Sequence, residues 1–178
     1  AFMNVATAAA IYDAVTEGKP LTHRNVTITG GSIERPMNVN APIGTPVEHL
    51  IKMAGGFKTQ PQRLLMGGPM MGVAIVSDEL PILKQNNAIL AFDEREAALR
   101  QPTACIRCGR CVAACPMHLM PTKLEQAVER QDVEALQSLD IMTCMECGCC
   151  SFSCPAGRRL VQAIRLGKNY VRKAGGKK

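Results

Sequence analysis

The residues best suited to chemistry in this chain are nine cysteines, all of which lie between Cys105 and Cys154. Residues 1–104 contain no cysteine. An odd number of cysteines, gathered in a short part of a larger chain, argues against a disulfide framework and for a metal site in a reducing compartment.

The cysteines follow one spacing twice. The sequence reads CIRCGRCVAACP at 105–116 and CMECGCCSFSCP at 144–155, which gives C-x2-C-x2-C-x3-C-P each time. This spacing is typical of bacterial [4Fe–4S] proteins, in which three closely spaced thiolates hold one cluster and the fourth reaches the other cluster. The sequence therefore predicts two clusters, the first held by Cys105, Cys108, Cys111 and Cys154 and the second by Cys144, Cys147, Cys150 and Cys115.

Cys149 is the ninth cysteine, and register with the first motif selects its neighbour Cys150 as the ligand. We expect Cys149 to pack beside a cluster without binding it, and a redox-sensor role for it has little support in the sequence. The histidines, His23, His49 and His118, have no ligand spacing. We interpret all three as structural or solvent-facing.

Structural zinc is the alternative metal for these motifs. Paired CxxC segments resemble a four-cysteine zinc site, and eight thiolates are enough for two zinc ions. Zinc ribbons require neither the third cysteine at a further x2 step nor the x3-C-P ending, so the spacing favours iron–sulfur clusters. Because each motif completes the other's ligand set, we expect residues 100–160 to lack ordered tertiary structure without metal.

Helices are expected to position both motifs. Residues 117–143 contain two apolar stripes at helical spacing, around Leu124 and Leu136, with Pro121 in a first turn and Asp132 able to cap. Downstream of the second motif, apolar residues again recur at helical spacing, namely Leu160, Ile164 and Val171. The cysteine-containing half is therefore predicted to be all-α, of the helical ferredoxin type.

The cysteine-free half predicts a small α+β domain. A helix is expected over residues 4–17, with Asn4 as its N-cap and Gly18 and Pro20 ending it. Its apolar stripe comprises Val5, Ala8, Ile11, Tyr12 and Val15. After this helix, apolar residues alternate on both sides of Gly30-Gly31, as they do in a β-hairpin.

A second short helix is expected in IGTPVEHLIKMAGGF, with a capping box formed by Thr45 and Glu48. Its Leu50, Met53 and Ala54 are predicted to face inward. Two to four further short strands are expected up to residue 92. No phosphate-binding glycine motif accompanies them, and GGPMMG is interpreted as a turn between strands.

The positive charge of the chain is confined to one segment. The net charge is +6, yet residues 1–104 balance nine basic against nine acidic side chains, and residues 155–178 hold eight Lys or Arg and no acid. Tyr170 is the only aromatic residue of that segment and no base-reading motif accompanies it, which argues against nucleic-acid binding. Counter-charge to anionic clusters, attraction to anionic lipid or an acidic partner, and a solvated helix face are three open interpretations.

Four blocks of the sequence together resemble one family. RCGRCVAACPMHLMPTKL, CMECGCCSFSCPAGRRLVQAIRLGK, NVATAAAIYDAV with the downstream VTITGG, and GGPMMG are similar to the C subunit of the Rnf (Rsx) electron-transport complex, a ferredoxin:NAD oxidoreductase. The resemblance implies an α+β fold. Its expected parts are a helix over 1–19 left from an upstream region, a small soluble-ligand-binding β-grasp (SLBB) domain over 20–92, a connector over 93–102, and a helical ferredoxin domain with two [4Fe–4S] clusters and a basic tail over 103–178.

The resemblance also implies a function. FMN and NADH are expected to bind only the upstream region, and this chain is expected to relay single electrons through its clusters between that site and the other subunits, coupled to ion transport. The resemblance places the protein at the cytoplasmic face of the bacterial inner membrane as a peripheral component of the complex, which meets the membrane through partners. The chain is thus part of an oxidoreductase complex but contains no acid–base pair or nucleophile for substrate chemistry.

Two other function classes stay open. One is an iron–sulfur subunit of a soluble oxidoreductase, like those of succinate dehydrogenase or heterodisulfide reductase, against which the β-grasp blocks argue. The other is a β-grasp binding module whose clusters only hold the fold. Redox titration distinguishes them, because clusters that stay redox-silent favour the binding module.

Overall fold

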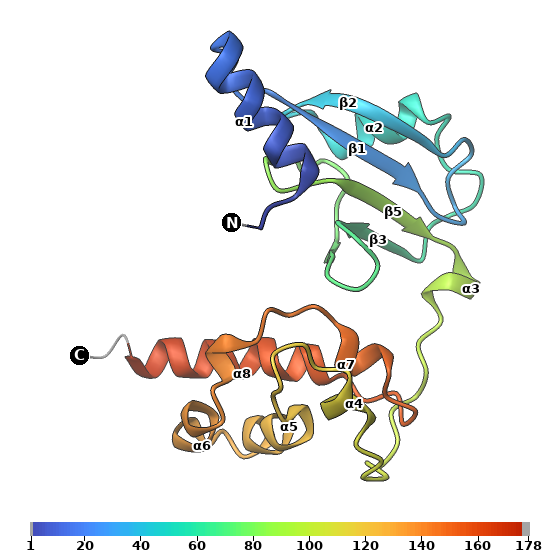
Figure 1. The fold of residues 1–178 in the computed structure, drawn as a ribbon. Coiled ribbons are helices and arrows are strands. Elements are labelled where there is room, and N and C mark those ends of the chain that lie inside the picture. The colour runs from blue at the N-terminus through green and yellow to red at the C-terminus, as the bar shows by residue number, and fades with distance from the viewer. Residues whose placement is uncertain (1, 176–178) are drawn as a thin grey trace. The chain divides into compact units, whose positions relative to one another are not determined.

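The computed structural model of the chain describes residues 2–175 (Figure 1). The chain divides into two compact units, Ala1–Ala98 and Leu99–Lys178. Each unit has a hydrophobic core of its own. Among the helices of the described residues, none combines the length and the apolar character that crossing a membrane requires.

The first unit is built on a five-stranded mixed sheet with the strand order β2-β1-β5-β3-β4. Its strands are β1 (His23–Thr29), β2 (Met37–Pro42), β3 (Arg63–Met66), β4 (Val73–Ile75) and β5 (Ala88–Phe92). Strands β1 and β5 run parallel in the middle of the sheet, and the other neighbours are antiparallel. This arrangement of a hairpin, a helix and a last strand parallel to the first confirms the predicted α+β class.

The β1–β2 hairpin forms where the alternation predicts it, but its connection is longer than a tight turn. Residues 30–36 join the two strands, and Ile33 from this loop is fully buried in the core. Gly30 has a φ of 120°, and a Cβ atom there would lie 2.2 Å from the carbonyl oxygen of Ala91 in β5. The absence of a side chain at Gly30 therefore allows the backbones of the hairpin loop and β5 to approach each other closely.

Helix α2 (Val47–Met53) packs on the sheet but lacks the predicted capping box. The Thr45 hydroxyl donates to the Pro42 carbonyl at 2.8 Å, and the Glu48 amide donates to the Asp78 carbonyl at 2.7 Å. The prediction that side chains of this helix face inward is right for Leu50 and Ala54 and wrong for Met53, which is 45% exposed. The buried face follows helical spacing instead, with Val47, Leu50, Ile51 and Ala54.

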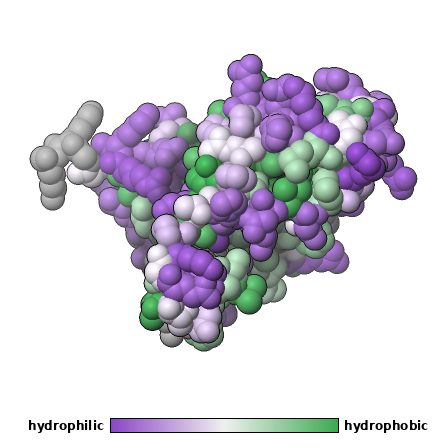
Figure 2. All heavy atoms as spheres, turned by 90° about the horizontal axis from the view of Figure 1, so that it is seen from above, coloured by the Kyte–Doolittle hydropathy of each residue, from purple (hydrophilic) through white to green (hydrophobic). Residues whose placement is uncertain are grey.

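Helix α1 (Val5–Glu17) has the predicted ends. The Asn4 side chain accepts a hydrogen bond from the Ala6 amide at 2.9 Å, and Gly18 adopts a left-handed conformation with a φ of 65°. Its apolar stripe is exposed, with Val15 at 80%, so the stripe adds nothing to the core of this unit. On the face shown in Figure 2, apolar residues lie scattered among hydrophilic ones. A short helix, α3 (Glu94–Ala97), ends the unit.

The second unit is helical, as predicted. Its elements are α4 (Arg110–Ala113), α5 (Pro121–Glu129), α6 (Val133–Ser138), the 3-10 helix η1 (Ile141–Thr143), α7 (Cys149–Phe152) and α8 (Leu160–Gly175). Pro121 starts α5, and the Asp132 side chain caps α6 by accepting from the Ala135 amide at 2.9 Å. Leu124, Leu136, Ile141 and Ile164 are fully buried between α5, α6, η1 and α8. Two short helices, α4 and α7, follow directly on the cysteine loops.

Candidate metal centre

The two cysteine motifs form loops of the same backbone shape. Arg107 and Glu146 occupy the same position in their motifs, and both are left-handed, with φ angles of 57° and 58°. Gly109 and Gly148 are also left-handed, with φ angles of 75° and 85°, and they are the N-caps of α4 and α7. These paired left-handed residues curl each loop, so that its first three cysteines border one cavity.

Backbone amides donate to the first sulfur of each motif. The Arg107 amide donates to Cys105 Sγ and the Glu146 amide donates to Cys144 Sγ, both at 3.4 Å. Hydrogen bonds to sulfur favour the thiolate form that metal binding needs, and they tune the potential of an iron–sulfur cluster. The repeated loop therefore supplies both ligands and their hydrogen-bond donors.

The fourth cysteine of each motif lies with the first three cysteines of the other. A cavity of about 350 Å³ is bordered by Cys105, Cys108, Cys111 and Cys154. A narrower cavity is bordered by Cys115, Cys144, Cys147 and Cys150. The structure thus brings the eight cysteines together in the two groups that the spacing predicts, and their binding of iron stays a prediction.

The donors that border each cavity are cysteine sulfurs alone, which fits an iron–sulfur core. The first cavity has a volume of about 350 Å³, whereas the second, of about 20 Å³, is almost filled by its own side chains. Within residues 2–175, no three side chains of His, Cys, Asp or Glu converge on a single metal ion. The preference for clusters over zinc therefore rests on the cysteine spacing.

The two cavities have different electrostatic surroundings. Arg107, Lys123 and Arg158 border the first cavity, whose Cys105 and Cys108 are exposed. The second cavity is bordered by apolar side chains besides its cysteines, including Met117, Leu119, Met145, Val161 and Ile164. Charge and solvent exposure are both determinants of cluster potential, so the two sites are not equivalent.

Burial raises the pKa of two of the eight thiols. The pKa of Cys150 rises to about 11, and that of Cys111 is also raised, in both cases mainly because burial disfavours the thiolate. Metal binding must overcome this cost, because ligand cysteines bind as thiolates. Cys149 borders neither cavity, and a hydrogen bond with Cys147 raises its pKa as well.

The buried charges behind the motifs were missed by sequence reasoning. Lys168 is 6% exposed and Glu125 is 7% exposed. The basic segment is thus not a uniformly solvated face, because three of its cations form ion pairs with acids of the cysteine-containing segment: Arg158 with Glu125 and Glu129, and Arg165 and Lys168 with Glu146. The helical spacing of Lys168 with Ile164 and Val171 was the available signal. Lys177 and Lys178 lie outside the described residues.

Comparison with protein families identifies one region in each unit. Residues 25–74 match the SLBB domain. Residues 104–158 match the 4Fe-4S dicluster domain, a segment that includes all nine cysteines. The chain therefore contains a dicluster domain for two [4Fe–4S] clusters.

Curated relatives match nearly the whole chain. The C subunit of the ion-translocating oxidoreductase complex of Rhodobacter capsulatus is 43% identical over 168 residues, which are 94% of this chain and 32% of the relative. The C subunit of the proton-translocating ferredoxin:NAD(+) oxidoreductase complex of Clostridium ljungdahlii is 42% identical over 174 residues, 97% of this chain and 38% of the relative. The Na(+)-translocating counterpart of Acetobacterium woodii is 39% identical over 169 residues, 95% of this chain and 38% of the relative. The chain spans about a third of the length of these relatives.

Proposed function

Since the chain belongs to the family formed by the C subunits of ion-translocating oxidoreductase complexes, we propose that it is the electron-relay segment of such a protein. The observation that carries the proposal is the connection between the two cysteine groups. Cys111 and Cys150, one from each group, are buried in one small core with Leu160 and Val161. The two cysteine groups thus meet at one shared core, which supports electron transfer from one cluster to the other.

The ligand roles follow from the two groups. Cys105, Cys108, Cys111 and Cys154 hold the first cluster, and Cys144, Cys147, Cys150 and Cys115 hold the second. When bound, each [4Fe–4S] cluster supplies one-electron transfer. The chain's own residues position the sulfurs, donate amide hydrogen bonds to them, and exclude water from the apolar second cavity.

In the whole protein, the relay operates between a flavin and NADH site outside this chain and the other subunits of the complex. The names of the relatives describe ferredoxin:NAD(+) oxidoreductases that translocate ions, which supports coupling of this relay to ion transport. The segment is peripheral at the cytoplasmic face of the inner membrane and meets the membrane through its partner subunits. It binds no nucleic acid. Its proposed parts are a segment over 1–19 that contains α1, the SLBB domain over 20–92, the connector over 93–102 and the ferredoxin domain over 103–178.

Anaerobic reconstitution with iron and sulfide tests the proposal. We expect about eight irons per chain and, after reduction, the EPR spectrum of two magnetically interacting clusters. A colourless protein that binds two zinc ions would overturn the cluster assignment. Eight irons that stay redox-silent across the physiological range would instead support an SLBB binding module with structural clusters.

A further inference from the structure

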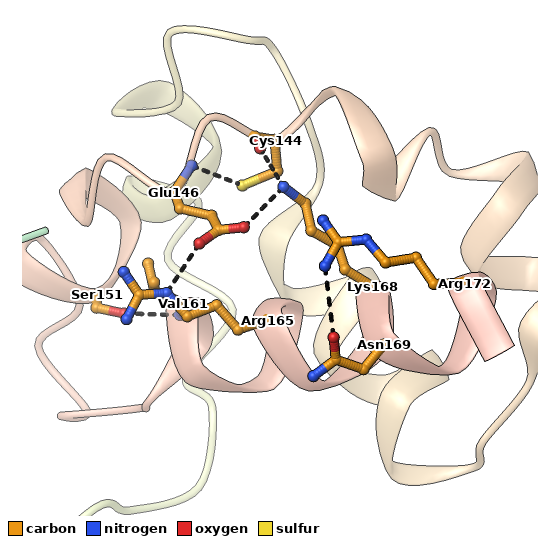
Figure 3. Close-up of polar contacts among 8 residues, drawn as sticks. All are labelled: Cys144, Glu146, Ser151, Val161, Arg165, Lys168, Asn169 and Arg172. Carbon is orange, nitrogen blue, oxygen red and sulfur yellow. Dashed lines mark hydrogen bonds and ion pairs between the residues drawn. The ribbon is translucent and has the colours of Figure 1, made fainter. Parts of the chain in front are cut away.

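A buried lysine lies behind the second cysteine loop (Figure 3). Lys168 of α8 is 6% exposed, and its Nζ donates to the Cys144 carbonyl at 2.5 Å and to Glu146 Oε1 at 2.8 Å. Arg165 Nε donates to the other oxygen of Glu146 at 2.9 Å. Burying an ammonium group is costly even when it is paired, so a buried lysine at this position is not an incidental part of the core.

The first motif shows that the loop itself does not require this lysine. Arg107 occupies the position of Glu146 there, with nearly the same φ angle and the same amide-to-sulfur hydrogen bond. Its side chain is exposed. The same turn therefore forms without an acid at this position, and the buried lysine behind the second motif needs another explanation.

The positive charge of Lys168 lies directly against a ligand residue of the second loop. Its Nζ contacts the backbone carbonyl of Cys144, and it pairs with Glu146 together with Arg165. The cavity in front of this loop is bordered by apolar side chains, where screening by water is weak. Cluster reduction adds one negative charge, so a nearby buried cation stabilises the reduced form.

We propose that Lys168 is a positioning residue for the second cluster that also raises its reduction potential. Its ammonium group fixes the Cys144–Cys147 loop against α8 and places a positive charge behind the ligands. The inference rests on the proposed function, because it requires a cluster at Cys115, Cys144, Cys147 and Cys150.

Two substitutions of opposite electrostatic sign test the proposal in the reconstituted protein. Lys168→Met removes the ammonium but keeps an apolar side chain of similar length, and Glu146→Gln removes the opposing charge. Lys168→Arg keeps the positive charge. Lys173→Met, on the exposed side of the same helix, is the matched control. Redox titration followed by EPR measures both potentials, and Cys115→Ala identifies the second cluster by removing it.

We expect Lys168→Met to lower the potential of the second cluster. It should also speed the loss of iron from that cluster to a chelator by about 10- to 100-fold, because loss of a residue that supports metal ligands typically weakens metal binding by this factor. Glu146→Gln should raise the same potential. Lys168→Arg keeps the positive charge and should leave the potential near the wild-type value. The proposal is overturned if the Met and Gln variants leave both potentials unchanged or shift them in the same direction. If Lys168→Met does not fold, Lys168→Gln takes its place, and an unchanged potential of the second cluster in that variant overturns the proposal. Fewer than about eight irons in the wild-type protein contradict the proposed function instead, which separates the two failures.

Discussion

Arg158 Nε donates to Glu125 Oε2 at 2.7 Å, and this ion pair joins the segment after Cys154 to the helix that follows the first motif. Glu125 is buried, and its hydrogen bond raises the pKa of Arg158 above its already high ordinary value. The pair therefore fixes the position of Cys154 relative to the motif whose ligand set it completes. Arg158 also pairs with Glu129, which is exposed.

Glu125→Gln should lower the free energy of unfolding of the second unit by about 1–3 kcal/mol, because it weakens a buried charge-assisted hydrogen bond. Glu129→Gln changes the exposed partner of the same arginine and should cost at most about 1 kcal/mol. Denaturant unfolding followed by circular dichroism measures both. Equal costs for the two variants would contradict the assigned importance of the buried pair.

Cys154→Ala should deplete the first cluster and Cys115→Ala the second, although each residue lies in the other motif. This crossed result follows from the two cysteine groups around the cavities. Iron analysis should give about four irons for each variant, and EPR should show that different clusters remain. Loss of the cluster of its own motif from either variant would refute the crossed assignment.

Cys149→Ser should keep both clusters, whereas Cys150→Ser should lose one. Cys149 borders neither cavity, while Cys150 is buried beside the second. The two adjacent substitutions change the same chemical group, so each is the control for the other. An iron content of about eight in the first variant and about four in the second is expected. The reverse pattern would identify Cys149 as the ligand.

Gly30→Ala should destabilise the first unit by about 3 kcal/mol. Gly30 has a positive φ that alanine adopts at a cost, and the new methyl group would collide with the β5 backbone. Gly68→Ala is the control, since a Cβ atom there meets nothing within 4 Å. Its effect should stay within about 0.5 kcal/mol. Thermal unfolding distinguishes them, and a stable Gly30→Ala protein would show that β5 can move away from the hairpin.

Removal of iron should unfold residues 100–160 and leave the sheet of the first unit intact. The cysteine loops belong to the second unit, and the first unit has a separate core around Ile28, Leu50 and Ile89. Two-dimensional NMR before and after chelation should show loss of dispersed signals from the cysteine-containing segment alone. Well-dispersed signals from that segment after chelation would be evidence against coupled folding.

Local sequence patterns predicted the elements that local forces determine. Asn4, Pro121 and Asp132 start their helices as expected, because helix capping depends on a few neighbouring residues. The grouping of the cysteines was also accessible, because the repeated spacing constrains which thiols share a cavity.

The sequence predictions fail where residues distant in sequence take the hydrogen bonds and ion pairs that local residues were expected to make. The Glu48 amide, which a capping box would use, donates instead to the carbonyl of Asp78 in the loop before β5, while the Thr45 hydroxyl donates to the nearby Pro42 carbonyl. In the sequence Lys168 belongs to a basic tail, because its partners Cys144 and Glu146 lie more than twenty residues away. Tertiary ion pairs of this kind cannot be read from charge counts.

The exchange of fourth cysteines has a consequence for the order of events during synthesis. The ribosome makes Cys105, Cys108 and Cys111 first, but their fourth partner, Cys154, emerges only after α5, α6 and most of the second motif. Neither ligand set is therefore complete on a nascent chain that stops between the motifs. Iron and sulfide delivery to this protein must wait for the whole cysteine-containing segment, so truncated translation products are expected to lack complete clusters.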